Sequence, residues 1–427
     1  MTSLKSGNRG SLVELLQLAL FRAGYYPEKA SGIFDVETEN ALRRFQAANN
    51  LPADAIVGPR TQAALYPWYV GYAAHTVRAG DNLYRLSLRY GSTVRAIELA
   101  NPTLDALSLQ PGTVIIVPLP FPVVPTNISC SSELIKYCCR GLAARYPFLT
   151  LSEIGKSAMG KPLYLFTLGE GGTKVFYNAS HHANEWITTI LLLHFLENLC
   201  RAAACGGNIY QMSARAILAK VSLAIAPAVN PDGIDLVTSA LTSGTYYDRA
   251  KTIAADYPEI AFPNGWKANI LGTDLNLQYP AGWEEARRIK YAQGFISPAP
   301  RDYVGPSVLS ASESRAVHDF TLSYNPALTL SYHTQGEVIF WKFLDYEPQR
   351  SREIANLFGD VSGYTVEETP FSSGFAGYKD WFIQNYNRPG YTIEAGFGEN
   401  PLPISQFDSI YEANLGILTL AMTALQG

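Results

Sequence analysis

Residues 174–188 read KVFYNASHHANEWIT. The first part is rich in β-branched and aromatic residues and predicts a short strand, whereas the apolar run 187–199 has helical spacing. His182 and Glu185 are therefore expected at a strand-to-helix turn, three residues apart. An imidazole and a carboxylate at this spacing can converge on one cation, and zinc prefers such nitrogen and oxygen ligands.

The His-x-x-Glu pattern is weak by itself, because many surface helices begin with a glutamate and carry a solvated histidine. The wider stretch 182–188, HANEWIT, resembles the zinc-site signature of the metallocarboxypeptidases. The resemblance continues through GTDLN at 272–276, SYHTQ at 331–335 and YTIE at 391–394. These blocks follow in the family's order over roughly the last 300 residues, a length that suits one large domain.

The resemblance implies a complete site. His182, Glu185 and His333 are expected to bind one zinc ion, Zn²⁺, and to leave a position for water. Glu394 closes an apolar strand, and it is expected to take a proton from that water and return it to the leaving amine. His181 is the alternative to His182 as a ligand. His182 is preferred for its spacing from Glu185, which leaves His181 to support the site or to contact substrate.

Departures from the family are also informative. In carboxypeptidases the block that ends with Asn276 continues with an arginine that grips the terminal carboxylate of the substrate, but here Leu277 follows. Loss of that bidentate clamp argues against removal of C-terminal residues from proteins. The family's oxyanion-stabilising arginine is missing as well, and Lys267 is the expected replacement. Tyr378 is the expected substitute for the family's catalytic tyrosine.

Lys379 falls where a specificity-determining side chain of the family projects, next to Asp380. A buried lysine there would favour a leaving residue with an acidic side chain. meso-Diaminopimelate carries both an amine and a carboxylate at its far end, so it would satisfy Lys379 and Asp380 together. Asn276 and Lys379 are expected to orient substrate carboxylates. These features, with residues 274–281 and 399–403, resemble the γ-D-glutamyl-meso-diaminopimelate peptidase branch of the family.

Two smaller modules precede this domain. Residues 10–66 predict three helices separated by turns, and their pattern resembles the helical peptidoglycan-binding domain family. Residues 75–118 predict a strand, two short helices and a closing strand, and they resemble LysM domains, which bind N-acetylglucosamine-containing glycans. Residues 67–73 are expected to form a linker, and the proline-rich residues 119–126 an extended spacer.

From residue 131 onward, strands alternate with helices. This predicts a multidomain protein whose α/β metallocarboxypeptidase-like catalytic domain has a mixed sheet flanked by helices, preceded by a three-helix domain and a βααβ LysM domain. We expect the domains to cover residues 1–68, 74–120 and 127–427. Ligands of such sheets collect at strand ends, which is where the candidate zinc ligands fall.

The composition limits the partners. The 427 residues have a net charge of −4 and 16% charged residues, so there is no basic excess and no nucleic acid partner is expected. No apolar run is expected to reach the roughly 18 residues of a membrane span, and no signal peptide is visible. The wall-binding modules nevertheless favour a location in the cell wall or outside the cell, with a sporulating cell as one setting.

The sequence thus predicts zinc-dependent hydrolysis of the γ-D-Glu to meso-diaminopimelate bond in peptidoglycan stem peptides. Two alternatives stay open: a zinc carboxypeptidase acting on ordinary peptides, and a wall-binding protein whose peptidase site has decayed.

Overall fold

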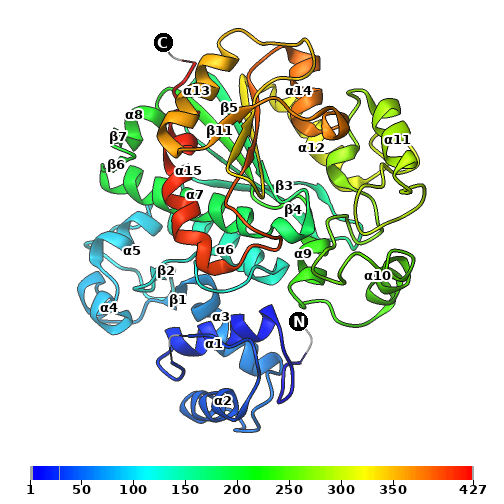
Figure 1. Ribbon diagram of the computed structural model, residues 1–427. Coiled ribbons are helices and arrows are strands. Elements are labelled where there is room, and N and C mark those ends of the chain that lie inside the picture. Colours follow the sequence, from blue (N-terminus) through cyan, green and yellow to red (C-terminus); the bar gives the residue numbers. More distant parts are fainter. Residues whose placement is uncertain (1–2, 28, 426–427) are drawn as a thin grey trace. The chain divides into compact units, whose positions relative to one another are not determined.

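The computed structural model describes residues 3–27 and 29–425, which form two compact units, Met1–Thr150 and Leu151–Gly427 (Figure 1). The elements of the first unit are α1 (Ser11–Arg22), α2 (Val36–Ala48), α3 (Pro59–Val70), β1 (Tyr72–Thr76), α4 (Leu83–Tyr90), α5 (Val94–Ala100), β2 (Val114–Pro118) and α6 (Ser132–Arg145). The expected three-helix module and βααβ module are therefore confirmed. β1 and β2 pair antiparallel, and α4 and α5 lie between them in the chain.

The expected linker at 67–73 is wrong. Helix α3 continues through Pro67 to Val70, and β1 begins at Tyr72. A proline inside a helix removes one backbone hydrogen bond. Here burial offsets that loss, because Tyr69 is 1% exposed and stacks on Tyr137 of α6, with ring centroids 4.8 Å apart.

The proline-rich residues 119–126 do not form an extended spacer either. Val123 and Val124 are buried, and Arg22 of α1 donates hydrogen bonds to the carbonyl oxygens of Pro122 and Val123. The segment is thus packed into the first unit, because its valines gain more from burial than they would from solvation. This unit also contains α6, so the boundary expected at residue 127 stays a prediction.

The second unit is built on one large sheet. Its strands are β3 (Thr150–Lys156), β4 (Pro162–Leu168), β5 (Thr173–Ala179), β8 (Val221–Ala226), β9 (Leu328–His333), β10 (Val338–Phe340), β11 (Thr365–Glu367) and β12 (Gly390–Glu394), with β6 (Asn208–Ile209) and β7 (Met212–Ser213) as a separate pair. The order across the sheet is β11-β10-β12-β9-β5-β8-β4-β3. β5 is parallel to β8 and β9, and β9 to β12, whereas β10 runs antiparallel to β12 and β4 antiparallel to β8. The prediction of a mixed sheet is confirmed.

Helices cover both faces of this sheet. They are α7 (Ile187–Cys205), α8 (Ala214–Leu218), α9 (Pro231–Val237), α10 (Thr245–Ala255), α11 (Trp283–Ala292), α12 (Ser312–Tyr324), α13 (Ser351–Ser362), α14 (Tyr378–Tyr386) and α15 (Phe407–Leu420). Single 3₁₀ turns occur at η1 (Ala183–Glu185), η2 (Leu275–Leu277), η3 (Phe371–Ser373) and η4 (Ile404–Gln406). In Figure 1, α7, α13 and α15 gather on one side of the sheet, and α12 and α14 lie on the other.

Successive residues of β5 show how the two faces are filled. Phe176 packs against Phe320 of α12 and Tyr378 of α14, with ring centroids 5.0 and 6.1 Å away. Tyr177 points to the other face, where its hydroxyl donates to the carbonyl oxygen of Leu418 in α15 at 2.8 Å. This alternation is the period of two expected of a strand that is buried on both faces.

Residues 183–205, which include α7, are long and apolar enough to cross a membrane, with a mean hydropathy of 1.3. The expectation that no stretch comes near this length is therefore too strong. In this structure 78% of the apolar window is buried, as is typical of a core helix. That the chain has no membrane span stays a prediction.

Candidate metal centre and active-site cleft

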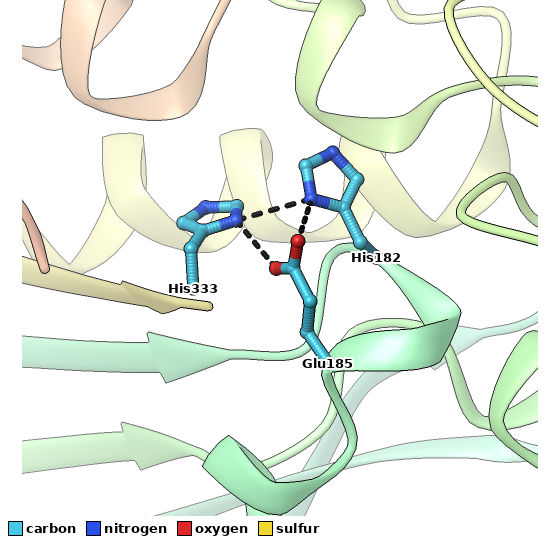
Figure 2. A group of neighbouring side chains, drawn as sticks. All are labelled: His182, Glu185 and His333. Carbon is cyan, nitrogen blue, oxygen red and sulfur yellow. Dashed lines mark hydrogen bonds and ion pairs between the residues drawn. The ribbon is translucent and has the colours of Figure 1, made fainter. Parts of the chain in front are cut away.

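The three predicted metal ligands meet at one edge of the sheet. β5, β9 and β12 are parallel, so their carboxyl ends lie side by side. His182 and Glu185 lie in the turn after β5, and His333 is the last residue of β9 (Figure 2). One ligand atom from each of the three residues lies within 4.8 Å of the other two.

The donor atoms already face one another. Nδ1 of His182 is 2.9 Å from Oε1 of Glu185, and Nδ1 of His333 is 2.9 Å from Oε2 of the same carboxylate (Figure 2). The two Nδ1 atoms are 3.2 Å apart. Two imidazole nitrogens and a carboxylate in such a group suit zinc.

Neighbouring residues contact the Nε2 atoms of both histidines, so that the Nδ1 atoms are available to a metal. Nε2 of His182 is 3.1 Å from Oδ1 of Asp274, so the carboxylate can accept the proton of that nitrogen. Nε2 of His333 is 3.4 Å from the hydroxyl of Ser331, whose own proton goes to Oδ1 of Asn178 at 2.7 Å. Partners of this kind select the tautomer of a metal-binding histidine. The residues present therefore fit a zinc ion.

The electrostatics of the group are those of a paired buried cluster. Burial alone would lower the pKa of His182, but the carboxylates of Glu185 and Asp274 raise it to about 9. Burial would raise the pKa of Glu185, but His182 and Lys267 together lower it well below its usual range. Lys267 donates to Oε1 of Glu185 at 3.0 Å. Although burial lowers the pKa of this lysine, Glu185 raises it overall, so the ammonium group stays charged.

Glu394 lies beside the metal group. It ends β12 directly opposite His333 in the strand pairing. Burial raises its pKa above the ordinary value for a glutamate, and the nearby Glu185 raises it further, against the opposing effects of His333 and Lys267. A carboxyl group with a raised pKa is well suited to accept and return a proton.

Two adjoining cavities open at this edge. Cavity A is lined by Asn276, Leu277, Lys290, Asp302, Lys379 and Asp380. Cavity B is lined by Asn184, Glu259, Thr334, Gln335, Glu399 and Asn400. Five residues line both cavities, namely Lys267, Arg301, Phe340, Ser373 and Glu394. Since Glu394 is one of them, the reacting bond of a substrate is expected at the junction of the two cavities.

Lys379 and Asp380 lie together in the wall of cavity A, and each is no more than 4% exposed. The Lys379 ammonium group donates to the carbonyl oxygen of Lys342 at 2.7 Å and to Oδ1 of Asp380 at 2.5 Å. Oδ2 of Asp380 accepts the backbone N–H of Gly377. An ammonium group has three donors, so one of those of Lys379 stays available as far as the described residues are concerned.

The expectation for Tyr378 needs correction, and the structure favours one of the two roles expected of His181. Tyr378 is wholly buried, and its hydroxyl is 3.1 Å from that of Thr321 in α12, so it does not line either cavity and cannot contact substrate there. The reason is the helical period, which turns Tyr378 toward the core while its neighbour Lys379 faces the cavity. His181 is also wholly buried. Its Nε2 bonds the Tyr279 hydroxyl at 2.9 Å and its ring stacks on His333, so it packs against the metal group and is not among the residues that line cavities A and B.

Lys290, Arg301 and Asp302 are among the residues of the cleft that the sequence reasoning missed. Lys290 comes from α11, and Arg301 and Asp302 come from the loop that follows it. Asp302 pairs with Lys290 and with Arg301, each at 2.6 Å. No motif marks these positions in the sequence, because the loop reaches the site only through tertiary contacts.

Profiles of known families match three parts of the chain. The peptidoglycan-binding domain profile matches residues 9–65, and the LysM domain profile matches residues 75–118. The zinc carboxypeptidase profile matches residues 135–416, about two thirds of the chain. The chain belongs to the zinc carboxypeptidase family. This family member therefore combines a metallopeptidase domain with two modules of wall-binding families, which suggest association with the cell wall.

Individual relatives agree with this family. The chain is 42% identical to "Gamma-D-glutamyl-L-diamino acid endopeptidase 1" of Lysinibacillus sphaericus over 276 residues, covering 65% of this chain and 68% of the relative. It is 38% identical to the YqgT protein of Bacillus subtilis over 280 residues, covering 65% and 73%. Bovine carboxypeptidase B is 22% identical over 281 residues, covering 61% of both chains.

Solved structures show the same fold. Bovine thrombin-activatable fibrinolysis inhibitor, solved with a tick carboxypeptidase inhibitor, superposes with a TM-score of 0.53 at 18% identity, covering 69% of this zinc carboxypeptidase and 97% of that chain. Carboxypeptidase A of Helicoverpa armigera gives a TM-score of 0.51 at 17% identity, covering 81% and 82%. Family membership implies zinc, and the group of His182, Glu185 and His333 could hold it.

Proposed function

We propose that this zinc carboxypeptidase hydrolyses the bond between the γ-carboxyl group of D-glutamate and meso-diaminopimelate in peptidoglycan stem peptides. The observation that carries the proposal is the Lys379–Asp380 pair in the wall of cavity A, which offers a cation and an anion to the far end of a diamino acid. The relative that is 42% identical is named for cleavage between γ-D-glutamate and a diamino acid, which supports the same bond.

His182, Glu185 and His333 would hold the zinc ion. When bound, zinc polarises a carbonyl group and lowers the pKa of water. Asp274 and Ser331, which lie next to the Nε2 atoms, would keep the two imidazoles turned so that Nδ1 faces the metal. Glu394 would take a proton from the attacking water and deliver it to the nitrogen of the breaking amide bond.

Two further residues would position the acyl group and the leaving amino acid. Lys267 lies at the junction of the cavities, where its ammonium group can stabilise negative charge on the reacting carbonyl oxygen. Asn276 lines cavity A and is held by the backbone N–H of Tyr378, which donates to its Oδ1 at 3.0 Å. Its amide group would bind the α-carboxylate of the leaving residue.

Lys379 and Asp380 would recognise the second carboxylate and the second amine of meso-diaminopimelate. A lysine at this place in the substrate has the amine but lacks the carboxylate. Leu277 lines the same cavity, so cavity A lacks the arginine clamp that an ordinary carboxypeptidase uses at this position. This argues against the alternative of a zinc carboxypeptidase acting on ordinary peptides.

The wall-binding modules would hold the enzyme on peptidoglycan, with the LysM module binding N-acetylglucosamine-containing glycan. Tethering of this kind raises the local concentration of substrate into the millimolar range for short connections. The enzyme would act at the cell wall, either outside the cell or within a sporulating cell.

The proposal is tested by zinc analysis together with mass spectrometry of products from L-Ala-γ-D-Glu-meso-diaminopimelate. We expect about one zinc per chain, release of diaminopimelate, and slower cleavage of the matching peptide with lysine in place of diaminopimelate. A zinc-loaded enzyme that ignores both peptides and trims protein C-termini would favour the ordinary carboxypeptidase. A site without zinc and without activity would favour a decayed, wall-binding protein.

A further inference from the structure

The junction between cavities A and B carries a cation that the proposed mechanism does not use. Arg301 lines both cavities, and its side chain is 43% exposed. Its Nε donates to Oδ2 of Asp302 at 2.6 Å. Within the part of the chain that the structure describes, neither terminal nitrogen of Arg301 has a hydrogen-bond partner, so this edge of the guanidinium group is available to a ligand.

Arg301 shares its carboxylate partner with a second cation. Asp302 offers one carboxylate to two cations, because Lys290 contacts Oδ1 and Arg301 contacts Oδ2. Lys290 is 8% exposed, whereas Arg301 is the exposed member of the group. Within this group of three, the cations therefore outnumber the carboxylate, and Arg301 is the member that the cleft can reach. The other junction cation, Lys267, is bonded to Glu185 and has the role at the reacting carbonyl oxygen that is proposed above.

The loop that carries Arg301 is fixed to the metal site. The backbone N–H of Lys267 donates to the carbonyl oxygen of Pro300 at 2.8 Å, and the N–H of Asp302 donates to Oδ2 of Asp274 at 3.2 Å. The N–H of Asp274 in turn donates to the carbonyl oxygen of Tyr303. These bonds tie both sides of Arg301 to the residues that support the zinc ligands, so the guanidinium group is placed before substrate arrives.

The proposed substrate has a matching group. When D-glutamate is joined through its γ-carboxyl group, its α-carboxylate remains free, a few bonds from the reacting carbonyl carbon. If diaminopimelate occupies cavity A, this carboxylate belongs on the acyl side, at the junction with cavity B. Cavity B is also lined by Glu259 and Glu399, which line no part of cavity A and would repel an anion. An arginine at the junction can instead form a charge-assisted pair of hydrogen bonds.

We propose that Arg301 binds the α-carboxylate of the γ-linked D-glutamyl residue and so makes the enzyme specific for γ-glutamyl over ordinary α-linked peptide bonds. The inference rests on the proposed function, because it assigns the acyl side of that substrate. It makes Arg301 a specificity-determining residue and leaves the bond-breaking chemistry to the groups described above.

The test compares two substrates that differ in this carboxylate alone. One is L-Ala-γ-D-Glu-meso-diaminopimelate, and the other is the same peptide with the α-carboxylate of glutamate converted to the amide. For the wild-type enzyme we expect kcat/KM to be about ten- to a hundredfold higher for the acid, as for loss of a hydrogen-bonded ion pair. In Arg301→Gln, kcat/KM for the acid should fall to the value for the amide, whereas kcat/KM for the amide should change by less than about threefold.

Two more variants make the comparison decisive. Arg301→Lys keeps the charge but loses the planar fork, so its preference for the acid should be reduced and still greater than one. Arg288→Gln removes an exposed arginine of α11 that pairs with Glu285 outside the cavities, so it should behave as wild type.

An equal loss of kcat/KM for both substrates in Arg301→Gln would overturn the inference, since it would indicate a role at the reacting carbonyl oxygen or in folding. An unchanged preference in both Arg301 variants would overturn it as well. A wild-type enzyme that cleaves acid and amide equally well would refute only this inference. One that cleaves neither would refute the proposed function and the inference together.

Discussion

At the scale of single residues, Asp274 links the metal group to the substrate cleft. Its Oδ1 lies 3.1 Å from Nε2 of His182, and its Oδ2 accepts the N–H of Asp302. Burial would raise the pKa of Asp274, but His182 lowers it well below its usual range, so the carboxylate stays ionised at neutral pH. One side chain thus orients a candidate zinc ligand and fixes the loop that carries Arg301.

Glu394→Gln tests the proton transfer. The amide keeps the shape of the side chain but cannot accept a proton, so kcat should fall by about 10²- to 10⁴-fold. Zinc content and thermal stability should remain those of the wild type. Glu353→Gln, which changes an exposed glutamate of α13, is the matched control. Turnover close to normal in Glu394→Gln would exclude this role.

Lys379→Gln tests recognition of the leaving residue. The glutamine can still donate toward the carbonyl oxygen of Lys342, but it lacks the charge that would bind the second carboxylate of diaminopimelate. We expect the preference for the diaminopimelate peptide over its lysine analogue to drop by about tenfold or more. The ratio of the two kcat/KM values measures this effect independently of how much active enzyme each preparation contains. A ratio that does not change would remove Lys379 from substrate recognition.

At the scale of elements, the contact between α7 and α15 contains a histidine that opposes folding in acid. His194 of α7 lies against Tyr411 and Phe407 of α15, with ring centroids 4.6 and 5.5 Å away. Its Nδ1 is buried, and it has no hydrogen-bond partner among the described residues. Burial, with a smaller effect of Arg201, lowers the pKa of His194 from 6.5 to about 4.

The sign of the pH effect follows from this shift. Above pH 6.5 the ring is neutral in both states, but between about pH 6.5 and 4 the unfolded chain binds a proton that the folded chain excludes. Stability is therefore lost as the pH falls through this window, by about 2 kcal/mol after allowance for partial exposure. His194→Phe should flatten the dependence of the unfolding free energy on pH, as measured with denaturant at several pH values. An equally steep dependence in the variant would contradict the assignment.

Helix α6 approaches α3 closely at Gly141. A methyl group at this position would meet the carbonyl oxygen of Val70 and the side chain of Val123. Gly141→Ala should therefore lower the free energy of unfolding of the first unit by about 1–3 kcal/mol. The added methyl group would meet a backbone carbonyl group of α3, which cannot move aside easily. The change can be measured by thermal unfolding. Gly172→Ala is the control, since a methyl group there has no neighbour within 4 Å. Equal melting temperatures for the two variants would contradict this packing.

At the scale of the whole molecule, two wall-binding families and a peptidase family share one chain. If the modules act as anchors, a soluble N-acetylglucosamine-containing glycan without stem peptides should compete with the wall for them. Such a competitor should slow hydrolysis of isolated cell walls severalfold or more, because it removes the effect of high local concentration. Hydrolysis of the soluble tripeptide should not change. Equal inhibition of both substrates would show that the glycan blocks the peptidase site.

Local sequence was sufficient for much of the fold. Helix starts could be predicted because side chains cap them locally: Asn82 accepts the N–H of Arg85 at the start of α4, and Ser131 accepts that of Leu134 at the start of α6. Local signals were misleading at Pro67 and in residues 119–126. There, burial of aromatic and aliphatic side chains outweighs the tendency of proline to end a helix or extend a chain.

For the site, the sequence by itself determined the residue types at the ends of three parallel strands. His182, Glu185, His333 and Glu394 follow apolar strand patterns, and parallel strands bring their carboxyl ends together. Only the tertiary structure decided that Tyr378 is buried and that Arg301 enters the cleft. The direction in which a side chain of a helix points depends on its packing partners, and the position of a loop depends on backbone hydrogen bonds to segments distant in the chain. Such long-range contacts leave no local pattern in the sequence.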